Sequence, residues 1–232
     1  MNKGIRNFFK TLPATYELIN TILTFGMDAI WRRKAVRWAA KGRNGGGAWL
    51  DICTGTGQMA RLSSKISSAE SLVVGADFSH PMLVEAKRKS NGAPIQFSGA
   101  DALHLPFGKQ SFNCVTIGFA TRNLNSIDGQ LPQAYREFHR VLKPGGCFVN
   151  VETSQPKWRL IKFFFHLYVK LTVKPVGKII SGSSPSYAYL ANSIRLFHDA
   201  DQLKQILLDA GFSTVEYKRL LFGAVAIHKA VK

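Results

Sequence analysis

Long apolar runs are missing from this 232-residue sequence. No stretch reaches the 18 or more uninterrupted apolar residues of a spanning helix, so we expect no transmembrane segment. The first ten residues carry basic side chains but no apolar run or small-residue cleavage site, so we expect no secretory signal. Hydrophobic residues still make up 46%, which excludes a disordered or fibrous chain. The length suits one domain with a substantial core.

Cysteine is scarce, and patterns typical of metal sites are absent from the sequence. Cys53, Cys114 and Cys147 are an odd number without CxxC spacing. We predict that they are small buried side chains in strands of a reduced, cytoplasmic protein. No histidine has ligand-like partners, and we predict no metal site.

Acidic residues are few and unevenly placed. The formal net charge is +17, of which residues 1–43 and 153–198 each carry +7. Residues 153–198 contain no acid at all, whereas 44–152 and 199–232 add only +2 and +1. Because the charge is segregated, we expect the two basic segments to face something anionic, either a membrane surface or nucleic acid.

Strand-like and helix-like stretches alternate after Gly42–Gly47, which we interpret as a linker behind a helical N-terminal arm. The predicted strands are Trp49–Cys53, Leu72–Phe78, Ile95–Gly99, Cys114–Phe119, Cys147–Val151, Thr214–Leu221 and Ala224–His228. The predicted helices are Gln58–Ser67, Pro81–Ser90, Leu131–Leu142, which Lys143–Gly146 should end, and Asp201–Ala210. The last two strands are too close for a parallel crossover and must form an antiparallel hairpin.

This order predicts one α/β domain around a mostly parallel seven-stranded sheet with helices on both faces. We divide it into an N-terminal arm (1–43), a cofactor-binding core (44–152), an inserted lid or substrate segment (153–198), and a C-terminal helix and hairpin (199–232).

A glycine-rich turn ends the first predicted strand and opens a helix. Gly55 and Gly57 let the backbone approach a ligand, and the helix N-terminus offers free N–H groups. Asp77 follows 20 residues after Gly57, at the tip of the second strand, where a carboxylate can accept both hydroxyls of a ribose. A Gly-x-Gly alone is as often only a tight turn, but the added Asp77 predicts a nucleoside-type cofactor.

A nicotinamide dinucleotide is the natural competitor, because Ala60 completes a Gly-x-Gly-x-x-Ala pattern. Three features favour a sulfonium cofactor instead. Asp51 would repel a pyrophosphate and attract a cationic ligand, and the chain ends in a hairpin rather than in another βαβ half. Gly99–Ala102, followed by Leu105–Phe107, matches an edge that binds adenine.

At these motifs the sequence resembles class I S-adenosylmethionine methyltransferases, which have a Rossmann-like fold. The matching segments are Leu50–Ala60, Gly75–Leu83, Gly99–Phe107 and Leu142–Gly146. Within that class the chain resembles the ubiquinone/menaquinone biosynthesis C-methyltransferase family over nearly its whole length. The segments that carry this closer resemblance are Tyr16–Trp31, Phe119–Asn123, Arg140–Ser154 and Tyr187–Arg195.

Several positions depart from the family pattern. Glu17 stands for Asp, Ile19 for Met, Asp28 for His, Thr54 for Gly, Gln58 for an acid and Gly118 for Ser. The resemblance implies S-adenosylmethionine as cofactor, with contacts at Thr56, Asp77, Asp101, Ala102 and Gly118. We add the loop residues Asp51, Gly55 and Gly57, and Phe78 beside Asp77, to the predicted cofactor site.

The resemblance also implies methylation of a ring carbon in a demethylated, lipid-tailed quinone or quinol. A guanidinium near the phenol would favour its nucleophilic phenolate form. Arg122 and Asn123 follow the fourth strand, at the edge where parallel sheets bind ligands, and Tyr16 is a weaker candidate. Arg122 could instead only cap a loop.

Lys157–Lys174 predicts an amphipathic lid helix rich in aromatic side chains. Its basic residues recur every three or four positions, at Arg159, Lys162, His166, Lys170 and Lys174. The segment could only pack on the core, or it could also bind anionic lipid at an interface, which predicts peripheral membrane association. The large aliphatic face and the lack of an RNA-binding module argue against nucleic acid.

Two alternatives stay open. The chain could methylate another hydrophobic acceptor, such as a sterol, a phospholipid amine or a phenazine. It could also be a non-catalytic binding partner that keeps the fold, although Asp77, Asp101 and Arg122 are intact. A homodimer is left open.

Overall fold

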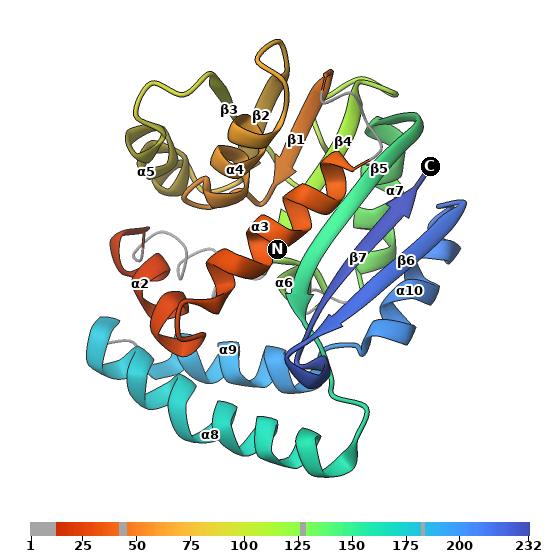
Figure 1. Cartoon of the computed structure of the whole chain (residues 1–232). Coiled ribbons are helices and arrows are strands. Elements are labelled where there is room, and N and C mark those ends of the chain that lie inside the picture. The colour runs from red at the N-terminus through yellow and green to blue at the C-terminus, as the bar shows by residue number, and fades with distance from the viewer. Residues whose placement is uncertain (1–12, 42–45, 126–128, 182–183) are drawn as a thin grey trace.

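The computed structural model describes residues 13–41, 46–125, 129–181 and 184–232. Seven strands form one sheet in the order β3-β2-β1-β4-β5-β7-β6 (Figure 1). Their bounds are Ala48–Ile52 (β1), Leu72–Asp77 (β2), Ile95–Gly99 (β3), Phe112–Gly118 (β4), Leu142–Thr153 (β5), Thr214–Leu220 (β6) and Val225–Val231 (β7). Strand β7 runs against both of its neighbours, and the other adjacent pairs are parallel. The predicted fold class and C-terminal hairpin are confirmed.

Helices cover both faces of the sheet. They are Pro13–Leu23 (α2), Met27–Ala40 (α3), Gln58–Ile66 (α4), His80–Ser90 (α5), Thr121–Asn125 (α6), Leu131–Val141 (α7), Arg159–Ser181 (α8), Ser184–Leu196 (α9) and Ala200–Asp209 (α10), with a 3-10 turn at Leu221–Gly223 (η1). On one face α3 and α4 bury Trp31 and Met59 against Trp49 of β1. On the other face α7 buries Tyr135 and Phe138, in a core that it shares with α10.

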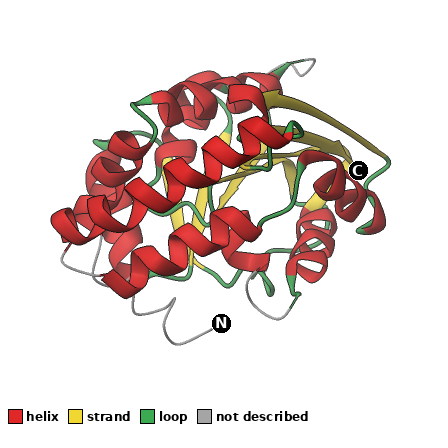
Figure 2. Cartoon of the chain, turned by 90° about the horizontal axis from the view of Figure 1, so that it is seen from below, coloured by secondary structure: helices red, strands yellow, loops and turns green. Residues whose placement is uncertain are grey.

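A third layer lies across the carboxyl ends of the parallel strands, where α8 and α9 run beneath the sheet beside α2 (Figures 1 and 2). Ile19, Val169 and Tyr187 form its small core. Helix α8 approaches α9 closely at Gly177, because a Cβ there would lie 1.9 Å from the Tyr187 ring. The predicted lid is therefore a pair of helices, of which only the first was predicted. No helix in these described segments is long and apolar enough to cross a bilayer.

One local prediction needs correction. Strand β5 begins at Leu142, directly after α7, so Lys143–Gly146 lies inside the strand instead of separating it from the helix. Gly146 is required there because a Cβ would lie 2.7 Å from the Lys143 carbonyl oxygen. The short helix α6 was not predicted, since five residues carry too little periodicity. Residues 1–12 of the arm and most of the predicted linker Gly42–Gly47 lie outside the described residues.

Candidate active site

The glycine-rich loop joins β1 to α4 and is held in place by Asp77. Gly55 and Gly57 have φ angles of 55° and 83°, a left-handed backbone that glycine adopts at low cost. Asp77 Oδ2 accepts the Gly55 N–H at 2.8 Å, and its Oδ1 accepts the Ser79 N–H at 2.9 Å. One carboxylate therefore fixes the loops that follow two neighbouring strands.

A cleft opens above these loops and gathers most of the predicted cofactor residues. Seven of the nine line it: Gly55, Thr56, Asp77, Phe78, Asp101, Ala102 and Gly118. Asn123 lines the same cleft, as do Arg32, Cys53 and Met82, which the sequence analysis missed. Asp51 and Gly57 are not among the lining residues, and Gly57 instead caps α4.

Asp51 lies beneath the loop. Its side chain is buried and accepts hydrogen bonds from Thr54 Oγ1 at 2.5 Å and Thr116 Oγ1 at 2.9 Å. Burial raises the pKa of Asp51 to about 6, although these two hydrogen bonds and the charge of Arg32 act in the opposite direction. Thr54, which departs from the family glycine, thus supplies a partner to the buried carboxylate.

The chemistry of the cleft fits the nucleoside of a sulfonium cofactor. Asp77 is buried, which raises its pKa, but N–H groups of Ser79, Gly55 and Phe78 stabilise its charged form. Each carboxylate oxygen can accept more than one hydrogen bond, so both remain able to bind ribose hydroxyls. Asp101 is exposed at the far side of the cleft, and Ala102 beside it is buried and apolar. Burial first, then the nearby carboxylates, raise the pKa of Cys53 well above its ordinary value and keep it a thiol.

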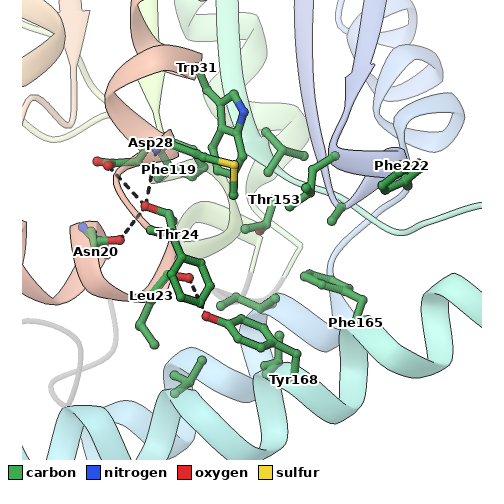
Figure 3. A pocket seen from close by; sticks show the side chains of 18 of the residues that line it. Asn20, Leu23, Thr24, Asp28, Trp31, Phe119, Thr153, Phe165, Tyr168 and Phe222 are labelled. Atoms are coloured by element: carbon green, nitrogen blue, oxygen red, sulfur yellow. Dashed lines mark hydrogen bonds between the residues drawn. The ribbon is translucent and has the colours of Figure 1, made fainter.

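A larger apolar cavity of about 370 Å³ lies next to the cleft, between α2, α3, α8, α9 and η1. Figure 3 shows Trp31 and Phe119 on one side of it and Phe165 and Tyr168, from α8, on the other. The Tyr168 hydroxyl donates to the Leu23 carbonyl oxygen at 2.7 Å and ties α8 to α2. Helices α8 and α2 are therefore joined beside this cavity.

Arg122 lines the apolar cavity, whereas the next residue, Asn123, lines the cofactor cleft. The Arg122 guanidinium is buried, and its Nη1 lies 2.8 Å from Glu152 Oε1 and 2.9 Å from the Phe119 carbonyl oxygen. Glu152 is 1% exposed. The sequence analysis missed it, because only the folded position of β5 brings its side chain to Arg122. Its charge offsets that of Arg122. The side chain of Tyr16 lies outside what the structure describes.

Arg32 is the one described residue that lines both the cleft and the cavity. It is buried, its Nη1 lies 3.4 Å from the Gly118 carbonyl oxygen, and its guanidinium lies over the Phe119 ring. A Cβ at Gly118 would lie 2.6 Å from Arg32 Nη1, so the glycine leaves room for this guanidinium. Arg32 also faces Asp28, with 3.6 Å between Nε and Oδ2.

Glu17 connects the N-terminal arm to the cofactor loop. Its carboxylate accepts hydrogen bonds from Thr56 Oγ1 and from Lys89 Nζ, the latter at 2.7 Å, and lies 3.6 Å from an Arg61 nitrogen. Burial raises the pKa of Glu17, but the hydrogen bonds and the positive charges of Lys89 and Arg61 outweigh it and lower the pKa below its ordinary value. Helix α2 is thus held against both α4 and α5.

Within the described ranges, no group of three or more His, Cys, Asp or Glu side chains could hold a metal ion.

Solved structures support the fold assignment. A methyltransferase of Thermotoga maritima aligns with a TM-score of 0.67 at 18% identity, over 97% of this chain and 98% of its own. A phosphoethanolamine N-methyltransferase of Haemonchus contortus, in complex with S-adenosylmethionine, aligns with a TM-score of 0.62 at 16% identity, over 86% of this chain and 52% of its own.

Sequence comparison is more specific. The chain is 37% identical over 229 residues to a ubiquinone/menaquinone biosynthesis C-methyltransferase of Desulfotalea psychrophila, covering 99% of this chain and 90% of that one. A protein of the same name from Pseudomonas putida is 36% identical over 99% of this chain and 89% of its own. The profile of the ubiE/COQ5 methyltransferase family matches residues 1–232. The resemblance is confirmed: the chain belongs to the ubiE/COQ5 methyltransferase family, and its cofactor is S-adenosylmethionine.

Proposed function

We propose that this chain transfers a methyl group to a ring carbon of a demethylated, lipid-tailed quinone or quinol. The observation that carries the proposal is the apolar cavity of about 370 Å³ that shares Arg32 with the cofactor cleft. A cavity of this volume is within the range of small-molecule sites and suits an aromatic head group with part of its tail. The names of the relatives from Desulfotalea psychrophila and Pseudomonas putida agree with this substrate class.

The part of the protein in the reaction is to align the acceptor with the methyl group and to exclude water. Bound S-adenosylmethionine supplies an activated methyl group, so the acceptor carbon must be held in line with it. Arg122 is proposed to stabilise the phenolate oxygen, and Asn123, from the cleft side, to orient the two ligands. Tyr16 stays a weaker proposal. The ion pair with Glu152 reduces the net charge that Arg122 can offer, so its effect depends on short-range hydrogen bonding.

The mouth of the cavity supports a lipid-tailed acceptor. Three large aromatic residues that line it are well exposed: Phe25 at 78%, Phe164 at 58% and Phe222 at 76%. They come from the arm, the lid and the C-terminal turn, and their exposed apolar surface suits an isoprenoid tail leaving the cavity. A small water-soluble acceptor would not need such a rim.

Peripheral attachment to an anionic membrane is the second part of the proposal. Arg159, Lys162, Lys170 and Lys174 are exposed on α8, together with apolar residues such as Phe163 at 61%. The stripe is interrupted at its middle, because His166 is half-buried and its Nε2 lies 2.8 Å from Gln155 Oε1. Four exposed basic residues beside large apolar side chains suit an interfacial helix.

The acceptor is identified by mass spectrometry. Lipid extract is incubated with the protein and labelled S-adenosylmethionine, and the expected product is a quinone with one label on its ring. Label in a sterol, a phospholipid amine or a phenazine would replace the proposal with the corresponding acceptor. Absence of label from every lipid would favour the non-catalytic alternative.

Membrane attachment is tested by sedimentation with anionic liposomes. Changing Arg159, Lys162, Lys170 and Lys174 to Gln should weaken binding, since each basic residue near the surface contributes about 1 kcal/mol, and salt screens this contribution. The matched control also changes one arginine and three lysines to Gln. These are exposed residues of the segment 44–152: Lys65, Lys87, Arg88 and Lys109. Equal loss in both variants would mean that only the overall charge matters.

A further inference from the structure

Asp28 is a buried carboxylate with an unused acceptor. Its side chain is 3% exposed, and its Oδ2 has no hydrogen-bond partner in the structure. Its Oδ1 lies 3.2 Å from Thr24 Oγ1, but that hydroxyl has one proton and lies closer, at 2.7 Å, to the Asn20 carbonyl oxygen (Figure 3). Buried polar atoms are normally satisfied, so such an oxygen calls for a ligand or a function.

The neighbouring cation does not hydrogen-bond that oxygen. Arg32 Nε is 3.6 Å from Asp28 Oδ2, too far for a hydrogen bond, and Nε also has no partner. The guanidinium is held instead by the Gly118 carbonyl oxygen and the Phe119 ring. Arg32 thus faces the Asp28 carboxylate without forming a hydrogen bond to Oδ2.

The position of Asp28 relates it to the acceptor. Asp28 is the one carboxylate that lines the apolar cavity among the described residues, where the charged neighbours are Arg32 and Arg122. Arg122 is already paired with Glu152, whereas Asp28 Oδ2 accepts no hydrogen bond. Arg32, which Asp28 faces, also lines the cofactor cleft, so Asp28 is one residue away from that cleft.

We propose that Asp28 accepts the hydroxyl proton of the aromatic acceptor, with Arg32 as a positioning residue. This rests on the proposed function. The O–H bond breaks, its proton moves to Asp28 Oδ2, and the electron pair left behind makes the ring carbon nucleophilic. That carbon bonds the methyl group, while the old C–S pair stays on sulfur. Asp28 then returns its proton to the oxygen, the methylated carbon releases its own proton to water, and the ring regains aromaticity.

Other ionisable groups line the cavity together with Asp28. They are Arg32 on the same helix, Arg122 on α6 and Tyr168 on α8. Glu152 of β5 is paired with Arg122 and does not line the cavity.

The decisive variant is Asp28→Asn, which keeps the size of the side chain but accepts no proton. We expect kcat with a short-tailed quinol to fall at least about 100-fold, the usual contribution of a general base. KM and the calorimetric affinity for S-adenosylhomocysteine should stay near those of the parent. Raising the pH towards about 10, where phenols ionise unaided, should restore much of the rate.

Asp28→His keeps a proton acceptor and is the rescue variant. Its rate should exceed that of Asp28→Asn, and the acid limb of its pH–rate profile should move towards about 6.5, the ordinary value of histidine. If Asp28→Asn folds poorly, the parent and Asp28→His profiles decide alone, and identical acid limbs would overturn the proposal.

A kcat of Asp28→Asn equal to that of the parent would also overturn the proposal. A loss of kcat together with an equal loss of affinity for S-adenosylhomocysteine would overturn it too, because Asp28 would then belong to the cofactor site. A parent protein that methylates no quinol would instead refute the proposed function. In that case the kcat values of the parent and Asp28→Asn are compared with the acceptor found by mass spectrometry, and this comparison decides whether Asp28 accepts the proton.

Discussion

Neutralising Glu17 should loosen the N-terminal arm from the cofactor loop. The Glu17→Gln change keeps the shape of the side chain but removes the charge shared by Lys89, Arg61 and Thr56. Hydrogen bonds to charged groups contribute about 1.5–3 kcal/mol, and the 21% exposure of Glu17 lowers this figure. We expect a loss of about 1–3 kcal/mol in the free energy of unfolding at neutral pH, measured by urea titration.

The pH dependence of the free energy of unfolding gives an independent test of the sign of the Glu17 contribution. The pKa of Glu17 is lower in the folded chain than in the unfolded one, so its charge stabilises the fold above the unfolded value. That contribution disappears as the pH falls through the folded pKa. The difference between parent and Glu17→Gln should therefore be full at pH 7 and vanish in acid.

Glu85→Gln is the matched control, because Glu85 pairs with Arg88 and Lys89 inside its own helix and joins no second element. Exposed pairs of this kind contribute little to stability, so Glu85→Gln should change the free energy of unfolding much less than Glu17→Gln. Glu17→Gln should also weaken S-adenosylhomocysteine binding several-fold, since Thr56 lines the cleft. Equal unfolding free energies for Glu17→Gln and Glu85→Gln at pH 7 would refute the reasoning.

Three further predictions concern the two cavities. Asp77→Ala should weaken S-adenosylhomocysteine binding at least about tenfold by calorimetry, because charge-assisted hydrogen bonds are lost, and unchanged affinity would remove Asp77 from the ribose site. Arg122→Ala should lower the free energy of unfolding by about 3–5 kcal/mol, because Glu152 is left buried without its partner, and it should also lower kcat. The double variant Arg122→Ala with Glu152→Gln should recover stability but not kcat. Recovery of both would contradict a role of Arg122 in the reaction. Gly118→Ala should leave folding nearly intact yet displace the Arg32 guanidinium, which would appear as altered kcat, and unaltered kinetics would show that the position of Arg32 is unimportant.

Local features of the sequence predict most of the sheet and the cofactor cleft. The turn after β1 must contain glycines with positive φ, and Asp77 stands at a strand end whatever the rest of the chain does. Seven of the nine residues predicted to bind the cofactor therefore lie together in one cleft. Asp51 misled because its place at the strand end does not reveal that Thr54 and Thr116 bury it.

Long-range contacts account for what the sequence could not predict. Arg32 meets Gly118 across 86 positions of the chain, and Glu17 meets Thr56 across 39, so no local pattern indicates either contact. The break predicted at Lys143–Gly146 failed for a similar reason. Leu142 pairs with Phe112 of β4 around an irregularity in the register. Strand β5 therefore begins before Pro144 and the two glycines that would normally end an element.

Three of the departures from the family pattern are matched by other residues, and this argues against decay into a scaffold. Thr54, in place of glycine, donates to Asp51. Gly118, in place of serine, leaves the space that Arg32 occupies, and Arg32 in turn faces Asp28, which stands in place of histidine. Substitutions that accumulate without selection on a site would leave unmatched charges and clashes around it. Here the substituted positions contact one another or their immediate neighbours, so the altered set has been kept compatible with a working cleft and cavity.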